Sequence, residues 1–412
     1  MRELYYGRLY WPELVKEHFS YPPLDSDKQV TVAIIGGGIS GAVCAYVLAK
    51  SGIDACILER GEVAGGSTSA NSGLLQFSSD IMLVDLIRQI GEKDAVSFYK
   101  ASRQALEQLA AIVAELKTDV GYTTRSSLYY ASAEEDEPKL RSEYEKLRSC
   151  GFEVEYWGPR TIGERYPFHK PGAIWTCGGD AEINPLQFVY AVAEGSCSMG
   201  QAIYERTEVV AHETLVNGVH RLKTSSGAAV DADHVIYAIG YEPEELKGRL
   251  IKADLNRTYA IATGPQHELA AWYGRSLIWE TSRPNFYMRT TPEGRVIAGG
   301  LDEEAPRPLQ DDEAMRKRSD KLLARIQEHF PGFQAPAEFE WTGIFGESRD
   351  NLPFIGEDPN RPGVYYCLGY GGNGTTYSLM ASTLLHDLIC GSDHPIAQIV
   401  RLDRPSLQKI QS

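Results

Sequence analysis

The glycines that follow the first β-branched run have the spacing of a dinucleotide-binding turn. Residues 30–41 read V-T-V-A-I-I-G-G-G-I-S-G, so that Gly36, Gly38 and Gly41 form the pattern G-x-G-x-x-G. The first glycine allows a sharp turn off a strand, the second lets the backbone approach a pyrophosphate, and the third lets the next helix pack closely. The pattern predicts an ADP-containing cofactor whose phosphates lie at the start of a helix.

A carboxylate follows the next apolar run, at the place where a cofactor ribose would lie. The run spans residues 53–58, and Glu59 and Arg60 come directly after it. Carboxylates at this position accept hydrogen bonds from ribose hydroxyls. The ADP half is therefore expected to contact the turn glycines, Ile39 and Ser40 at the helix start, and Glu59 and Arg60. The alternative is a glycine-rich turn in an ordinary α/β protein, but the strand, the helix and the carboxylate agree with a cofactor site.

A second glycine-rich loop precedes a helix near the other end of the chain. It spans residues 369–374 (G-Y-G-G-N-G), between an expected buried strand, 364–368, and an expected helix that ends at Cys390. Reduced FAD carries negative charge near N1 and C2=O of its isoalloxazine ring, and backbone N–H groups of 372–375 would stabilise it. An NAD-linked dehydrogenase would leave this loop and the Ser/Thr-rich loop 61–76 without a role. FAD is therefore the favoured cofactor.

The composition limits the classes of partner. A chain of 412 residues exceeds the usual size of a single core, so two lobes are expected. The net charge of −15 and the lack of a basic stripe exclude a nucleic-acid surface and favour a small neutral or cationic partner. Seven cysteines without C-x-x-C spacing, and no H-E-x-x-H pattern, predict no disulfide and no metal site. Because no run resembles a signal peptide or a membrane span, a soluble cytoplasmic protein is expected.

The glycine loops need a parallel sheet and flanking helices to position them. Apolar spacing predicts helices over 94–117, 134–149 and 313–330, and an amphipathic helix over 42–50 after the first glycine turn. Short strands with hairpin signals cover 207–240. They predict a small β-meander that returns to a buried parallel strand.

In their order along the chain, the motifs resemble the FAD-dependent superfamily of D-amino-acid oxidase, glycine oxidase and sarcosine oxidase. The resemblance covers nearly all of the chain after residue 28. Each motif is only moderately specific, but their shared order makes the resemblance strong. The motifs are the glycine turn with Glu59-Arg60, Gly66-Ser67-Thr68-Ser69 through Gly73-Leu74-Leu75-Gln76, Val235–Gly240, Phe286-Tyr287-Met288-Arg289 through Gly299-Gly300, Trp341-x-Gly343 with Arg349-Asp350, Pro353 and Gly356, and Gly369–Gly374.

The resemblance implies an α/β fold, α+β overall. It consists of a Rossmann-like FAD-binding lobe with a β-meander, and a substrate lobe built on a large mixed or antiparallel sheet. Residues 1–28, which hold three prolines and many aromatic residues, are expected to form an N-terminal strap docked along the surface. The expected domains are 29–90, 150–242 and 338–412 for the discontinuous FAD-binding domain, and 91–149 and 243–337 for the substrate domain.

The family motifs also imply which residues contact FAD. Beyond the ADP contacts, the expected residues come from the Ser/Thr-rich loop, the meander and the second glycine loop: Gly66, Ser67, Thr68, Ser69, Asn71, Gly73, Leu74, Leu75, Val209, Gly240, Gly371, Gly372, Asn373, Gly374 and Thr375. Some relatives bind the flavin covalently through a cysteine. This sequence has no such cysteine near Phe345. Bound FAD is therefore expected to be noncovalent.

The resemblance implies oxidation of a C–N bond in a small amine or amino acid. Hydride passes from the carbon that bears nitrogen to flavin N5, water hydrolyses the imine, and O2 or another acceptor takes the electrons. The reacting amine must be neutral, and little acid–base machinery is needed. The other hypothesis is a flavin-binding scaffold without turnover.

The usual anchors for a substrate carboxylate are missing. Gln76, Phe345 and Thr376 stand where relatives carry basic residues, and all three are uncharged. Arg289 falls close to a lysine that faces the flavin in sarcosine-oxidase-like enzymes. We therefore expect Arg289 to anchor substrate or to promote oxygen reduction; the alternative is a salt-bridged strand residue.

Three further residues are candidates for the catalytic site. Tyr287 lies in the same motif as Arg289, and Tyr370 stands inside the second glycine loop. Asn373 could hydrogen-bond the flavin ring. The alternatives are that Tyr370 packs against the flavin lobe and that Asn373 caps the following helix.

Overall fold

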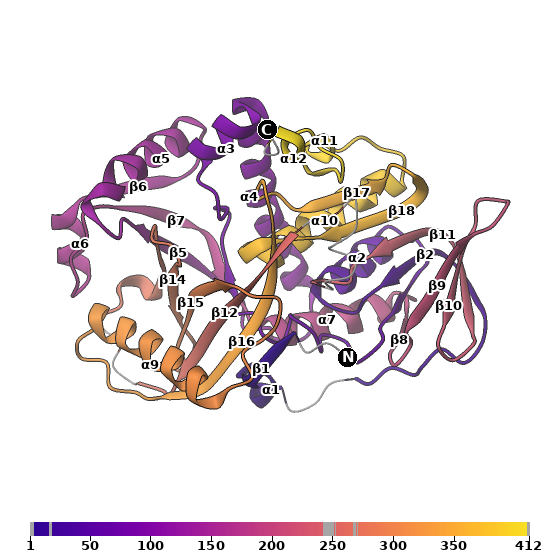
Figure 1. Ribbon diagram of the computed structural model, residues 1–412, viewed down its shortest axis with the longest axis horizontal. Coiled ribbons are helices and arrows are strands. Elements are labelled where there is room, and N and C mark those ends of the chain that lie inside the picture. Colours follow the sequence, from indigo (N-terminus) through magenta and orange to yellow (C-terminus); the bar gives the residue numbers. More distant parts are fainter. Residues whose placement is uncertain are drawn as a thin grey trace.

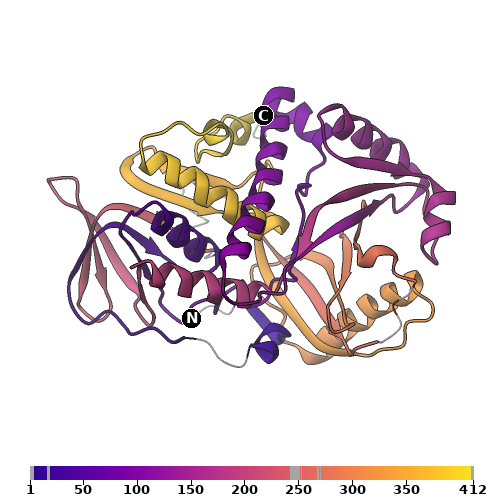
Figure 2. The same ribbon diagram turned by 180° about the vertical axis from the view of Figure 1, so that it is seen from behind.

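The chain is built on two β-sheets that stand side by side, with helices packed around them (Figure 1). The computed structural model describes residues 4–15, 19–241, 251, 253–266, 269 and 271–409. Figure 2 shows helix α4 (Glu92–Glu115) running between the two halves of the molecule. The remaining longer helices are α3 (Leu83–Ile90), α5 (Glu137–Ser149), α6 (Pro159–Arg165) and α9 (Asp312–His329). The helices predicted over 94–117, 134–149 and 313–330 are thus confirmed within a few residues.

Five parallel strands form the centre of the eight-stranded sheet, in the order β18, β11, β2, β3, β8. The β-branched strand β2 has Val32, Ala33 and Ile34 fully buried, as expected when helices cover both faces of a parallel sheet. β9 and β10 complete the predicted meander with β11. The strands are β2 (Lys28–Ile35), β3 (Ala55–Leu58), β8 (Ala202–Tyr204), β9 (Val209–Thr214), β10 (His220–Thr224), β11 (Ala229–Tyr237), β17 (Phe354–Asp358) and β18 (Arg361–Leu368).

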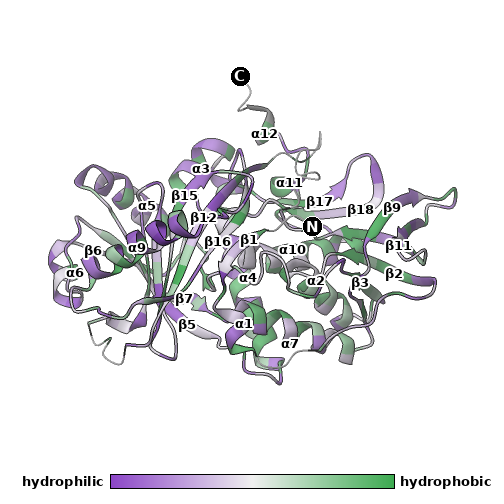
Figure 3. Cartoon of the chain, turned by 60° about the horizontal axis from the view of Figure 1, so that its bottom comes forward, coloured by the Kyte–Doolittle hydropathy of each residue, from purple (hydrophilic) through white to green (hydrophobic). Residues whose placement is uncertain are grey.

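Three helices pack beside this sheet: α2 (Ile39–Lys50), α7 (Pro185–Ser198) and α10 (Gly374–Ile389). The expectation of an amphipathic helix over 42–50 is wrong, because Lys50 is the single exposed residue of α2. α2 packs against the sheet, α7 and α10, so its whole circumference is apolar. Figure 3 shows the same contrast, with hydrophobic residues along α2 and α7 and hydrophilic ones along α9.

The second sheet has ten strands and is mixed, because β13 runs parallel to β5 while its other pairs are antiparallel. The predicted ranges 150–242 and 338–412 supply strands to both sheets, since β6, β7 and most of β16 lie here. The predicted boundary between residues 242 and 243 lies outside the described residues. The strands are β1 (Tyr5–Arg8), β4 (Leu74–Leu75), β5 (Thr123–Tyr130), β6 (Val154–Trp157), β7 (Ala173–Glu182), β12 (Ala253–Thr263), β13 (Leu277–Glu280), β14 (Phe286–Thr290), β15 (Val296–Glu304) and β16 (Ala337–Ser348).

The N-terminal strap docks, but as part of the second sheet rather than along the surface. β1 pairs antiparallel with β16, so that Tyr5 lies opposite Gly343. The short helix α1 (Trp11–Leu14) follows, and Tyr10 and Trp11 are buried. Tyr10 and Trp11 therefore belong to the core, whereas Phe19 is exposed.

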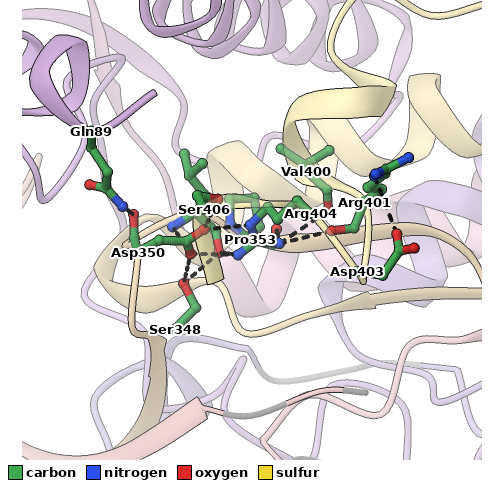
Figure 4. Close-up of polar contacts among 10 residues, drawn as sticks. Gln89, Ser348, Asp350, Pro353, Val400, Arg401, Asp403, Arg404 and Ser406 are labelled. Atoms are coloured by element: carbon green, nitrogen blue, oxygen red, sulfur yellow. Dashed lines mark hydrogen bonds and ion pairs between the residues drawn. The ribbon is translucent and has the colours of Figure 1, made fainter. Parts of the chain in front are cut away.

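A buried ion pair fixes the C-terminal segment beneath the end of β16 (Figure 4). Arg404 donates from Nε and Nη2 to the two carboxylate oxygens of Asp350, each at 2.6 Å, and both side chains are almost fully buried. Ser348 and Ser406 also donate to this carboxylate. Arg404 further donates to the carbonyl oxygens of neighbouring loops, so every polar group of the cluster is engaged. Two short helices, α11 (Ala397–Val400) and α12 (Ser406–Lys409), frame the pair.

Within the described residues, every helix is too short or too polar to span a lipid bilayer.

Candidate functional site

A cavity of about 1470 Å³ is lined by residues of both sheets and by both glycine loops. The predicted site residues that line it are Gly36, Gly38, Ile39, Ser40, Glu59, Arg60, Gly66, Ser67, Thr68, Asn71, Leu74, Val209, Gly240, Tyr287, Tyr370, Gly371, Gly372, Asn373 and Gly374. The predicted site residues outside its lining are Gly41, Ser69, Gly73, Leu75, Arg289 and Thr375. Most of the predicted set, drawn from seven separate stretches of sequence, is thus brought to one place.

Gly36 and Gly41 shape the first turn, whereas Gly38 borders open space. Gly36 has a φ of +108°, and a Cβ atom there would lie 2.4 Å from the carbonyl oxygen of Ala238. A Cβ atom on Gly41 would lie 1.9 Å from the carbonyl oxygen of Gly36, so turn and helix touch here. A Cβ atom on Gly38 would meet only Thr68 Oγ1, at 3.4 Å. The space next to Gly38 therefore lets a ligand reach the backbone, which fits a pyrophosphate.

Side chains from two other segments hold this turn. Glu59 accepts hydrogen bonds from the N–H groups of Gly37, at 2.7 Å, and Gly61, at 2.6 Å, which ties the loop after β2 to the loop after β3. Thr68 Oγ1 accepts from the Ile39 N–H at 3.2 Å. Gly38, Ile39 and Ser40 line the cavity, so the positive end of α2 faces it. The arrangement suits an anionic group.

Several residues of the Ser/Thr-rich loop hold its shape through hydrogen bonds and burial. Asn71 donates to Thr375 Oγ1 at 3.2 Å, and its Oδ1 accepts from the Gly73 N–H at 2.7 Å. Ser69 donates to a backbone carbonyl of the preceding turn. Leu75 is buried in strand β4. Asn71 thus links this loop to the start of α10.

The second glycine loop is tied to the segment after β4. We expected the Gly372 N–H to face the flavin, but it donates to Asp80 Oδ2 at 2.7 Å. Asn373 donates from Nδ2 to the carbonyl oxygen of Ser78 at 3.0 Å and does not cap α10. Tyr370 is buried and lines the cavity. The Gly372 N–H is therefore available to a ligand only when Asp80 releases it.

Arg289 lies outside the cavity lining, buried beneath the Ser/Thr-rich loop. Its Nη1 is 3.6 Å from Glu182 Oε2, and both side chains are almost fully buried. Its Nε donates to the carbonyl oxygen of Ser72 at 3.0 Å, and its Nη2 to that of Ile183 at 3.2 Å. Burial lowers the pKa of Arg289, whereas the charge of Glu182 raises it. This position agrees with the alternative of a salt-bridged strand residue, because Arg289 holds backbone segments together.

Replacing Arg289 by methionine should destabilise the protein by about 1–3 kcal/mol, because the carbonyl oxygens that Arg289 binds would lose their donor. Glu182 would lose one of its two cations but keep its ion pair with Arg125, at 2.8 Å. Urea unfolding would measure the loss. The matched control is Arg141→Met, which removes an exposed i,i+4 ion pair with Glu137 and should cost less than about 1 kcal/mol. Wild-type stability in the Arg289 variant would show that the ion pair is not structural.

The sequence reasoning missed the polar residues that the second sheet brings to the cavity. Asp80, Asp302 and Glu347 line it, and so does Arg283. Burial raises the pKa of Asp302 to about 6. Burial, followed by the charge of Asp80, raises the pKa of Glu347 to about 7. No motif marks these residues; the one available signal was strand alternation, which sets residues of β15 and β16 on a common face.

A model of the DAO family, described as FAD dependent oxidoreductase, matches residues 31–388 of the chain. This match covers the eight-stranded sheet, the second sheet except β1, and both glycine loops. It confirms the expected family and its FAD cofactor.

Individual relatives agree with the family match. The chain is 26% identical over 403 residues to a Bacillus subtilis protein that carries the name of a Rieske 2Fe-2S iron-sulfur protein, YhfW. The aligned region covers 95% of this chain and 76% of that protein. The chain is 27% identical over 388 residues to glycine oxidase of Geobacillus kaustophilus, covering 87% of this chain and 92% of that one. The crystal structure of glycine oxidase from Geobacillus kaustophilus matches with a TM-score of 0.76 at 24% identity, over 92% of this chain and 99% of that one. The expected α/β fold class is confirmed.

Proposed function

The chain belongs to the DAO family of FAD dependent oxidoreductases, and we propose that it oxidises the C–N bond of a small amine or amino acid. The observation that supports this function best is the cavity. It joins the open space next to Gly38 to a set of aromatic and ionisable side chains on the second sheet. Glycine oxidases and an Escherichia coli gamma-glutamylputrescine oxidoreductase are among its relatives, and their names describe amine or amino-acid chemistry.

We assign the ADP half of FAD to the first glycine turn. The open backbone at Gly38 would admit the pyrophosphate, and the positive end of α2 favours its charge. Glu59, already anchored by two N–H groups, has lone pairs left for ribose hydroxyls. Gly38, Ile39 and Glu59, to which these roles are assigned, all line the cavity.

We assign the isoalloxazine half to the second glycine loop, residues 371–374. Backbone N–H groups at the start of α10 would stabilise the charge of the reduced ring. Among the described residues, no cysteine lines the cavity, which supports noncovalent binding. The cofactor and its loop are thus expected to separate when the protein is denatured.

Bound FAD would supply a two-electron acceptor for hydride. The chain has to bind the amine in its neutral form, orient the C–H bond and exclude water until the electrons have moved. Tyr287 and the stacked rings of Tyr129 and Trp279 supply apolar surface for this purpose. The substrate loses hydride from carbon and a proton from nitrogen. Water then hydrolyses the imine to a carbonyl compound and ammonia or an amine, and O2 or another acceptor takes the two electrons.

The purified protein should be yellow and should release FAD into solution when it is precipitated with acid. Under anaerobic conditions, an amine or amino acid that is a substrate should bleach the flavin absorbance within the time of turnover. A nicotinamide cofactor in place of flavin would instead support a dehydrogenase. Bound flavin that no amine or amino acid bleaches would support a scaffold without turnover, and colour that stays in the precipitate would contradict noncovalent binding.

A further inference from the structure

One part of the cavity is bordered by three carboxylates, which we call the acidic wall: Asp80, Asp302 and Glu347. Asp80 follows β4, Asp302 lies in β15 and Glu347 lies in β16, so three distant segments supply it. The charges of the three groups interact: burial is the larger cause of the raised pKa values of Asp302 and Glu347, and the charge of Asp80 raises both further. A ligand beside this wall therefore lies in a negative potential.

Among the described residues, the side chains compensate only part of this charge. Arg283 lines the cavity and lowers the pKa values of all three carboxyls, but its side chain is exposed and donates to the backbone carbonyl of Asp80 at 2.7 Å. One guanidinium against three carboxylates leaves a net charge of −2 when all are ionised. The other arginines in the lining, Arg60 and Arg206, come from loops on the side of the eight-stranded sheet.

A buried acceptor in the acidic wall has no hydrogen-bond partner among the described residues. Oδ1 of Asp302 is shielded from solvent, yet no donor reaches it. The side-chain oxygen of Asn285, which lines the same cavity, is in the same state. Native proteins rarely leave buried acceptors unpaired, because desolvation is then uncompensated. These two oxygens indicate that a ligand supplies N–H donors at this place.

Aromatic faces border the same part of the cavity. The rings of Tyr129 and Trp279 stack with centroids 3.8 Å apart and an interplanar angle of 8°, and Tyr287 lies on the neighbouring strand β14. Such faces attract ammonium groups. Gln76 and Phe345, which stand where relatives bind a carboxylate, line the cavity without charge, so they offer an anionic substrate group no cation.

We propose that the substrate is an amine with a second cationic group at its far end, such as an α,ω-diamine, held at Asp302 and Glu347. This inference rests on the proposed function, because it places the oxidised amine in the same cavity. The reacting nitrogen is neutral, while the distal ammonium group donates to the carboxylates and stacks against the aromatic rings. A carboxylate at that end of the substrate would meet the acidic wall and be repelled.

Three amines of equal length test this charge preference. They are a four-carbon diamine, the alkylamine in which a methyl group replaces the distal ammonium group, and the amino acid in which a carboxylate replaces it. The concentration dependence of anaerobic flavin bleaching gives an apparent dissociation constant for each. The diamine should bind at least about tenfold more tightly than the alkylamine, and the amino acid most weakly. Tighter binding of the amino acid would overturn the inference.

Variants of the acidic wall assign the preference to its residues. Asp302→Asn and Glu347→Gln should each weaken diamine binding about tenfold and leave alkylamine binding unchanged. The control is Glu304→Gln, an exposed residue two positions from Asp302 on the same strand, which should bind both amines like the wild type. Equal FAD content in all variants establishes that the cofactor site is intact. Unchanged diamine binding in both wall variants would overturn the assignment.

A cation that cannot be oxidised separates this inference from the proposed function. The four-carbon bis(trimethylammonium) ion has no N–H to lose, and calorimetric titration of the FAD-loaded protein measures its binding. It should bind more tightly than the ion with a single quaternary group, and Glu347→Gln should remove the difference. If this holds while no amine bleaches the flavin, the amine oxidation fails and the cation site stands. If amines bleach the flavin but the two ions bind with equal affinity, the cation site is refuted and the amine oxidation stands.

Discussion

Replacing Gly38 by valine should abolish FAD binding and leave the fold of the chain unchanged. A Cβ atom there would meet only Thr68 Oγ1, at 3.4 Å, so the protein itself has room for a side chain. The backbone at Gly38 has φ −77° and ψ −170°, which other residues adopt readily. A branched side chain would instead fill the space through which a pyrophosphate reaches the backbone. We expect affinity for FAD to fall at least about 100-fold, or about 2.8 kcal/mol.

Equilibrium titration with FAD and circular dichroism of the same samples check this result. Gly158→Val is the matched control, because Gly158 also precedes a helix, has φ −77° and ψ 175°, and a Cβ atom there would meet nothing within 4 Å. It should bind FAD like the wild type. Gly41→Ala provides the contrast, since its Cβ atom would lie 1.9 Å from a backbone oxygen and should disrupt the fold itself. FAD retained by the Gly38 variant would refute the assignment of this turn.

The first glycine turn could be predicted from the sequence because its physics is local. Gly36 and Gly41 are required by contacts within a few residues of chain or with the adjacent strand, and Glu59 holds the turn through two backbone N–H groups. Each of these features leaves a residue type at a fixed spacing. The second glycine loop is similar, since a strand, glycines and a helix follow one another directly.

The position of Arg289 could not be predicted in the same way. Arg289 and Tyr287 are two residues apart on β14 and therefore project from the same face of the strand. The cavity ends between them: Tyr287 lines it, whereas Arg289 lies beneath Ser72 and is paired with Glu182. Alternation along a strand defines the face, but the depth of the cavity depends on how the Ser/Thr-rich loop packs over that face.

The acidic wall was invisible in the sequence for a different reason. Asp80, Asp302 and Glu347 are separated by long stretches of chain, and each is an unremarkable acidic residue in its own segment. Their meeting depends on the order of strands in the ten-stranded sheet, where β15 and β16 flank β12. β16 belongs to this sheet rather than to the eight-stranded sheet because it pairs with β1 and β12, and no local sequence pattern predicts that pairing.

Replacing Arg404 by methionine should lower the free energy of unfolding by about 3–5 kcal/mol at neutral pH. The substitution would leave Asp350 buried with a charge and without the two hydrogen bonds at 2.6 Å that balance it. Urea unfolding at several pH values measures the loss. Arg401→Met is the matched control, because Arg401 is a nearby arginine whose side chain is 41% exposed, and its ion pair with Asp403 should contribute less than about 1 kcal/mol.

The pH dependence of this loss identifies the buried pair as its cause. Burial raises the pKa of Asp350, but the hydrogen bonds and charge of Arg404 outweigh burial and hold the pKa below its ordinary value. In the wild type, the folded state thus binds fewer protons than the unfolded state, so the contribution of the pair is present above the unfolded pKa of about 3.9 and disappears as the pH falls through the folded pKa. In the Arg404 variant, the hydrogen bonds from Ser348 and Ser406 are left to oppose burial, so the pKa of Asp350 rises, and a falling pH neutralises the buried charge. The stability difference between the two proteins should therefore be largest near pH 7 and shrink steadily toward about pH 4. A difference that stays constant across this range would show that Arg404 acts through packing rather than through its charge.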